Sequence, residues 1–209
     1  MMSNIEKRFV DVEVRAETTE EEKMVIEGYA LKFNTKSNPL RSNDISFVET
    51  ISPEALKEAD MEDVRALIDH NPSLVLARTS ADTLKLEVDE VGLRFRAELA
   101  DTTYARDLYK NIQAGNINQC SFAFELNEKG DSVRYNKETR MYERTLNSFK
   151  KIMDVSAVTY PAYNDTDVAP ALRSIEEAEK EAGRLKERHK RKLELELFRM
   201  QAEGDLNKQ

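Results

Sequence analysis

Cysteine, histidine and long apolar runs are scarce in this sequence, and each shortage excludes a class of protein or site. The 209 residues include one cysteine, Cys120, which excludes an internal disulfide and a structural zinc site built from several cysteines. A single cysteine also fits a reducing compartment. No apolar run approaches the roughly 18 residues that a membrane span needs. No apolar core follows the first residues, so we expect no secretory signal.

The charge balance bears on the partners of the chain. The net charge is -8 and the pI is about 5.1, which argues against nucleic acid as a partner. Charged residues make up 34% of the chain, and much of this charge follows Arg173. The length of the chain and the position of this charge together suggest one domain followed by a charged extension. Because the sequence has no Gly-rich phosphate loop and no clustered metal ligands, we expect no cofactor.

What the sequence does contain is a series of short segments with apolar or alternating character, which predict a mostly β domain. Strands are predicted over residues 7–16, 24–33, 45–51, 63–68, 74–79, 84–88, 93–99, 121–126 and 150–160. The polar segment 131–144 is predicted as a hairpin or an exposed loop. Strands at this close spacing are typical of an antiparallel barrel or a sandwich.

Helical periodicity occurs in two main places. Tyr104, Leu108 and Ile112 lie four residues apart and predict a helix over 102–114, which Gly115 ends. A second pattern, over 174–200, has apolar residues at steps of three and four in a strongly charged background. It predicts a long amphipathic helix with a narrow apolar stripe. This helix could dock on the domain, pair with another helix or stay partly free.

Three residues have the side chains that nucleophilic catalysis requires. Ser121 begins a strand directly after a helix and a tight turn, and His70 stands at the end of the strand 63–68. Asp154 lies within the strand 150–160, where alternation predicts that Ile152 and Ser156 share its face. A sheet could bring the three together as nucleophile, base and orienting carboxylate. Spacing alone also allows a turn serine, a surface histidine and an outward-facing aspartate.

Seven motifs occur in an order that resembles the tailed-phage prohead serine proteases, whose fold is similar to that of herpesvirus assemblin. The resemblance covers roughly residues 25–170. The motifs are EGYALKFN (27–34), FVETISPEAL (47–56), ALIDHNP (66–72), GLRF (92–95), TYARDLY (103–109), QCSFAF (119–124) and MDVSAVTYPAY (153–163).

The resemblance implies a role for each candidate residue. It implies Ser121 as nucleophile, His70 as general base and Asp154 as the third member, with the neighbouring Asp69 as a competitor for that last role. Ala123 stands where glycine is frequent in the family. The implied fold is a closed antiparallel β-barrel ringed by helices, here with a long charged helix at the C-terminus, and the family usually works as a homodimer.

The resemblance also implies a biological role. A protease of this family cleaves scaffold or the N-terminal segment of the major capsid protein, and also itself, inside the assembling procapsid in the host cytoplasm. Residues 1–172 would then form the protease domain, and 173–209 a scaffold-like helical tail that self-cleavage removes.

Two other interpretations stay open. The chain could be a non-catalytic assembly or scaffold protein that keeps the protease fold. Alternatively, Cys120 could replace Ser121 as the nucleophile. Adjacent residues of a strand point to opposite faces, so the two side chains cannot both face His70. The resemblance favours Ser121.

Overall fold

Thirteen strands and two α-helices make up the described part of the chain, in a computed structural model that describes residues 5–10, 14–18, 23–42, 45–159 and 169–206. The α-helices are α1 (Thr103–Gln113) and α2 (Ala169–Leu206), and short 3-10 helices span Pro53–Leu56 and Thr79–Ala81. The strands are β1 (Ile5–Val10), β2 (Arg15–Thr18), β3 (Met24–Lys32), β4 (Leu40–Ser42), β5 (Ile45–Ile51), β6 (Arg65–Ile68), β7 (Asn71–Arg78), β8 (Leu84–Val88), β9 (Gly92–Glu98), β10 (Gln119–Leu126), β11 (Asp131–Asn136), β12 (Met141–Leu146) and β13 (Phe149–Val158).

These strands form three separate sheets, so the closed antiparallel barrel was a wrong expectation. The β10 sheet has the order β1-β10-β13-β6-β7, the β5 sheet β11-β12-β5-β4, and the β3 sheet β2-β3-β9-β8. A barrel closes only when every strand has hydrogen-bonded neighbours on both sides, and each of these sheets ends in two edge strands. The pairs β12–β5 and β13–β6 are parallel, so the sheets are not purely antiparallel either.

The predicted elements are confirmed in most places. The helix expected over 102–114 is α1, and its first turn is capped by the Thr102 hydroxyl, which accepts the N–H of Ala105. The polar segment 131–144 is the hairpin of β11 and β12. The strand expected over 7–16 is instead two strands, β1 and β2, in different sheets. Residues 11–13 between them lie outside the described residues.

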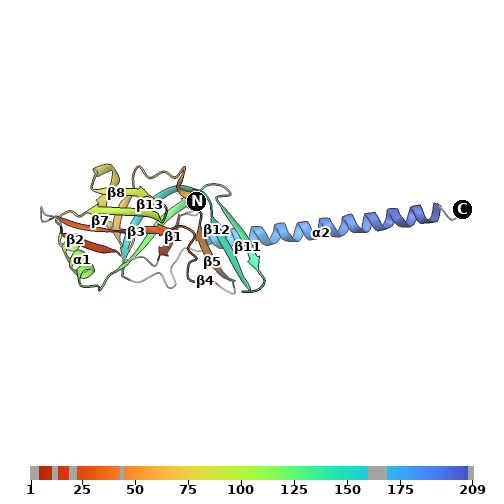
Figure 1. The fold of residues 1–209 in the computed structure, drawn as a ribbon, viewed down its shortest axis with the longest axis horizontal. Helices are drawn as coiled ribbons and strands as arrows, with labels where there is room; N and C mark the ends of the chain where they lie inside the picture. The colour runs from red at the N-terminus through yellow and green to blue at the C-terminus, as the bar shows by residue number, and fades with distance from the viewer. Residues whose placement is uncertain (1–4, 11–13, 19–22, 43–44, 160–168, 207–209) are drawn as a thin grey trace.

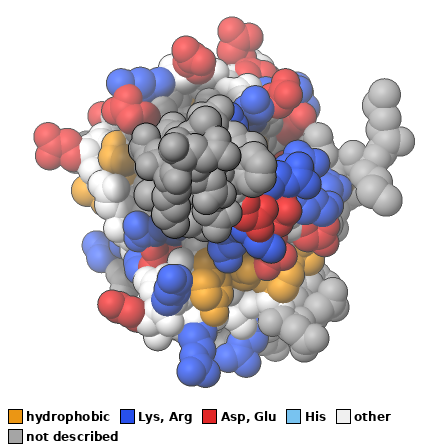
Figure 2. Space-filling model, turned by 90° about the vertical axis from the view of Figure 1, so that its right-hand side faces the viewer, with side chains coloured by type: hydrophobic (Ala, Val, Ile, Leu, Met, Phe, Trp, Pro, Cys, Tyr) orange, Lys and Arg blue, Asp and Glu red, His pale blue; other side chains and the backbone are white. Residues whose placement is uncertain are grey.

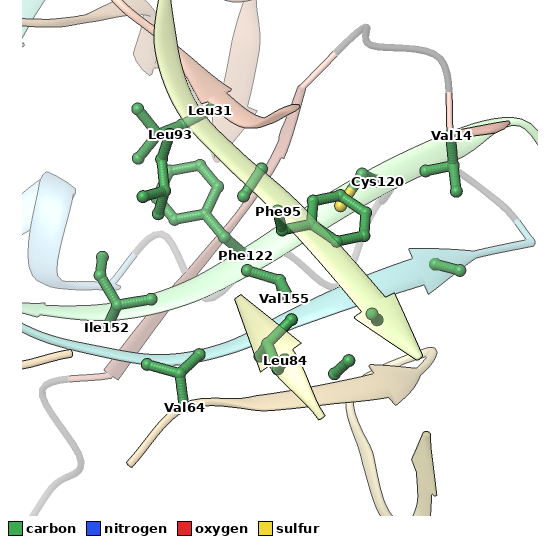
Figure 3. Close-up of a cluster of buried hydrophobic side chains, with 14 of the residues drawn as sticks. Val14, Leu31, Val64, Leu84, Leu93, Phe95, Cys120, Phe122, Ile152 and Val155 are labelled. Carbon is green, nitrogen blue, oxygen red and sulfur yellow. The ribbon is translucent and has the colours of Figure 1, made fainter. Parts of the chain in front are cut away.

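The main hydrophobic core lies between the β10 sheet and the β3 sheet (Figure 3). Phe122 of β10 and Val155 of β13 meet Leu31 of β3 and Leu93 of β9 in this layer, and all four are buried. Helix α1 adds Leu108 and other apolar side chains to the same cluster. Burial of this layer holds one face of β10 and β13 against the core and leaves their other face available for polar residues.

A network of buried charges joins the β10 sheet to the β5 sheet. Arg144 of β12 donates to Glu6 of β1 at 2.6 Å and to Glu49 of β5 at 2.7 Å, and it also bonds Asp131 at 2.5 Å. Arg8 of β1 donates to both Glu6 and Glu49. Burial alone would raise the pKa of Glu49, but Arg8 and Arg144 outweigh burial and keep this pKa below its usual value. Through these bonds, Glu6 and Arg8 attach β1 to the β5 sheet.

Helix α2 leaves the body at the β5 sheet and projects away from it (Figure 1). Its first turns are docked, because Ala171 and Ile175 are fully buried against Phe47 of β5. Further along, Leu185 is 58% exposed and Leu193 is 47% exposed. The structure confirms the predicted helix, and among its described side chains Ala171 and Ile175 dock its base on the body.

We predict that Arg144→Met destabilises the fold by about 3–5 kcal/mol, because the substitution leaves Glu6 and Glu49 buried with Arg8 as their remaining cation. Denaturant unfolding followed by circular dichroism measures the change. The control is Arg94→Met, which removes a partly exposed ion pair with Glu27 and should shift the unfolding midpoint little. Equal shifts for the two variants would contradict the structural role of the buried network.

Candidate active site

Strand β10 places Ser121 on the face that points away from the main core. Helix α1 ends before Gly115, which has a φ of 76°, and the strand begins at Gln119. Cys120 and Phe122 belong to the hydrophobic core. Because neighbouring side chains alternate between the two faces of a strand, Ser121 lies on the opposite face. Its exposed fraction is only 3%.

The register of β13 on β10 places Asp154 on the same face as Ser121. Ser156 pairs with Ser121 and Asp154 pairs with Ala123, but the next residue of β10 pairs with Ile152. Met153 is therefore one extra residue in β13, and an extra residue reverses the alternation of side chains. Ile152 is in the hydrophobic core, whereas Asp154 and Ser156 face the site. The expectation that Ile152 and Asp154 share a face was wrong for this reason.

The turn between β6 and β7 carries His70. Asp69 and His70 have φ values of 48° and 55°, and Ile68 pairs with Asn71 across them. Two positive φ values are typical of a type I′ hairpin turn, which favours glycine and asparagine. The cost of holding other residues there is about 1 kcal/mol each. Asp69 secures the turn, because its carboxylate accepts the N–H and the hydroxyl of Thr159.

The structure brings the three predicted residues together. His70 Nε2 lies 2.7 Å from Ser121 Oγ, and His70 Nδ1 lies 2.7 Å from Asp154 Oδ1. Asp154, not Asp69, is therefore the carboxylate in contact with the imidazole. A serine hydroxyl, an imidazole and a carboxylate in this order can activate the serine as a nucleophile. This geometry fits the roles expected for the three residues.

The site contains two further contacts, of which only the first has a signal in the sequence. Ser156 Oγ donates to Asp154 Oδ1 at 2.7 Å, and alternation along the strand predicted that these two residues share a face. Ser121 Oγ also lies 2.9 Å from the backbone oxygen of Arg8 in β1. The sequence has no signal for this second contact, because it depends on how a distant strand pairs with β10.

Cys120 is poorly suited to act as the nucleophile. Its thiol is fully buried on the core face of β10, and burial raises its pKa to about 12. Only the thiolate is a good nucleophile, so a neutral thiol facing the core has neither the charge nor the direction required. The contact with His70 is made by Ser121.

No group of three or more His, Cys, Asp or Glu side chains in the described ranges could hold a metal ion. Within the same ranges, no helix is both long and apolar enough to cross a membrane.

Comparison with known proteins shows what this chain is similar to. The family model of the caudovirus prohead serine proteases matches residues 10–181. The structure of the bacteriophage T4 capsid assembly protease is similar at 14% identity and a TM-score of 0.42, over 74% of this chain and 99% of that chain. No curated protein matches the chain.

We predict that Cys120 resists alkylation in the folded protein, because its thiol is buried and neutral at pH 8. Iodoacetamide labelling, measured by intact mass with and without denaturant, should modify Cys120 only after unfolding. Cys120→Ala should retain the activity of the wild type. Rapid labelling of the native thiol together with loss of activity would instead support a cysteine nucleophile.

Proposed function

The chain belongs to the caudovirus prohead serine protease family, and on this premise we propose that it is an active serine endopeptidase of capsid maturation. The observation that supports activity is the hydrogen-bonded series of Ser121, His70 and Asp154, with 2.7 Å at both contacts of the imidazole. A member of the family that had lost catalysis would have no need to keep all three groups in this geometry.

In the proposed mechanism, His70 Nε2 accepts the hydroxyl proton of Ser121 as Oγ attacks the carbonyl carbon of the substrate. Asp154 accepts the N–H of His70 Nδ1, which fixes the tautomer and stabilises the imidazolium. Ser156 orients Asp154 by donating to the same carboxylate oxygen. His70 then returns the proton to the leaving amine, and water, activated by the same imidazole, hydrolyses the acyl-enzyme.

The proposed substrates are proteins of the assembling capsid. They are the scaffold, the N-terminal segment of the major capsid protein, and the protease chain itself. We propose that the enzyme acts as a homodimer inside the procapsid, in the cytoplasm of the host. Family membership supports the general role in capsid assembly.

We also propose that the chain divides into a protease domain, residues 1–172, and a helical tail, residues 173–209, that serves assembly. The exposed part of α2 supports this division, since Leu185 and Leu193 have large exposed fractions. The end of the body seen along α2 carries mixed acidic and basic side chains beside a hydrophobic area (Figure 2). Self-cleavage would remove the tail once assembly is complete.

We predict that Ser121→Ala and Asp154→Asn each lower proteolysis by about a thousandfold or more, because each removes one member of a single catalytic unit. Mass spectrometry of the purified proteins, alone and with the cognate coat protein, would identify the cut sites. Asp101→Asn, a change to an exposed aspartate, is the control and should cleave at the wild-type rate. If the wild type cuts nothing yet still joins procapsids, the chain is a non-catalytic assembly protein.

We predict that a chain ending at Lys180 folds and cleaves peptides normally but enters procapsids poorly. The truncation keeps the docked residues Ala171 and Ile175 and the bond between Tyr142 and Glu179, and it removes the exposed stripe. Quantification of the protease in purified procapsids measures incorporation. Normal incorporation of the truncated chain would exclude an assembly role for the removed residues.

A further inference from the structure

We propose that β1 occupies the place of a substrate strand and keeps the active site closed, so that the edge of β10 beneath β1 is the docking surface for an extended peptide segment. This inference rests on the proposed function of Ser121. It adds an intramolecular competitor, residues 5–10 of this chain, and a mode of substrate binding, which is strand addition to β10.

The first observation is the register of β1 on β10. Six residues of β1 pair antiparallel with residues 120–125, and Phe9 stands opposite Ser121. The carbonyl oxygen of Arg8 lies 2.9 Å from Ser121 Oγ. The backbone of β1 is therefore in direct contact with the hydroxyl group that would attack a substrate.

This contact is unproductive for catalysis. The hydroxyl of Ser121 has one proton and two acceptors within reach, His70 Nε2 at 2.7 Å and the Arg8 oxygen at 2.9 Å. When the proton is donated to Arg8, it is no longer donated to the base. The contact is also with the carbonyl oxygen, as a hydrogen bond, whereas attack requires approach to the carbonyl carbon. The backbone of β1 thus competes with His70 for the proton of Ser121. It also covers this residue, whose exposed fraction is 3%.

The second observation is the place of β1 at the edge of its sheet. The order β1-β10-β13-β6-β7 means that removal of β1 leaves β10 as an edge strand. An edge presents unpaired N–H and C=O groups that an extended peptide can pair with. A substrate segment bound in this way would pass Ser121 in the same direction and position as β1 does now. We therefore infer a substrate that is locally extended, such as an unfolded segment of a capsid or scaffold protein.

The third observation is that β1 can leave without isolating a buried charge. Glu6 and Arg8 are bonded to each other and would leave as a pair. Arg144 would still have Glu49 at 2.7 Å and Asp131 at 2.5 Å as partners. None of the side chains described for residues 5–8 belongs to the main hydrophobic cluster, although the Arg8 guanidinium lies over the ring of Phe124. Displacement of β1 therefore costs ion pairs and backbone hydrogen bonds but does not open the apolar core through those residues.

The test uses full-length proteins in which β1 is fixed or loosened. Ile5→Cys with Glu125→Cys joins two residues that stand opposite each other, four positions along β10 from Ser121. Oxidation of this variant fixes β1, and reduction releases it. Glu6→Gln with Arg8→Met removes the two buried charges of β1 but keeps its backbone, and this is the loosened variant. The matched control is Lys36→Met with Glu143→Gln, which removes an ion pair of the β5 sheet that does not involve β1.

The measurement is the rate at which a small fluorophosphonate modifies Ser121, located by peptide mapping, with Ser121→Ala as the blank. We expect the oxidised double-cysteine variant to react about tenfold or more slowly than its own reduced form, since the rate follows the fraction of open molecules. The loosened variant should react about tenfold or more faster than the wild type, and the control variant at the wild-type rate. Equal rates for the oxidised and reduced forms would overturn the inference.

Hydrogen exchange separates this inference from the proposed function. Amides of residues 119–126 should exchange faster in the loosened variant than in the wild type, whether or not Ser121 is reactive. If they do, and Ser121 stays unmodified in every variant, the proposed catalytic role fails while displacement of β1 stands. If Ser121 reacts but neither its rate nor the exchange depends on β1, the catalytic role stands and the inference about β1 fails.

Discussion

The pairing of β10 with β13 is the constraint on which the site depends. One face of both strands is packed into the hydrophobic core through Phe122 and Val155, so the register of the pair cannot slip without moving apolar side chains into the polar face. Within this fixed register, Asp154 pairs with Ala123 and shares the face of Ser121, and the extra residue Met153 returns Ile152 to the core face. The same packing that stabilises the fold therefore sets the distance between Ser121 and Asp154.

The imidazole of His70 is placed at the site by a turn and not by a strand. His70 lies in a turn whose two central residues have positive φ, a conformation that a histidine adopts only at a cost. Asp69 offsets part of this cost by bonding Thr159, directly after β13. The parallel pairing of β6 with β13 carries the turn to the same end of the sheet. Local strain is thus tolerated where it places the imidazole between Ser121 and Asp154.

The buried charges hold the edge strand β1 in its place beside Ser121. Arg144 and Glu49 fix β1 through Glu6 and Arg8, and β1 in turn contacts Ser121 through a backbone oxygen. Charges buried in this way stabilise the fold only while each one keeps an opposite partner. A closed site held by ion pairs, and not by apolar packing of the described side chains, is suited to opening when the chain meets an extended segment during assembly.

The sequence by itself determined most of the local elements and the identity of the candidate site residues. Periodicity predicted α1, α2 and most strands, and the ordered motifs indicated the family that residues 10–181 match. Only the tertiary structure decided the three open sheets, the bulge at Met153 and the contact of Asp154 rather than Asp69 with His70. The physical reason is that periodicity reports which side chains can be buried. Strand order, register and edge contacts depend instead on pairings between residues far apart in the chain, such as Arg8 with Ser121.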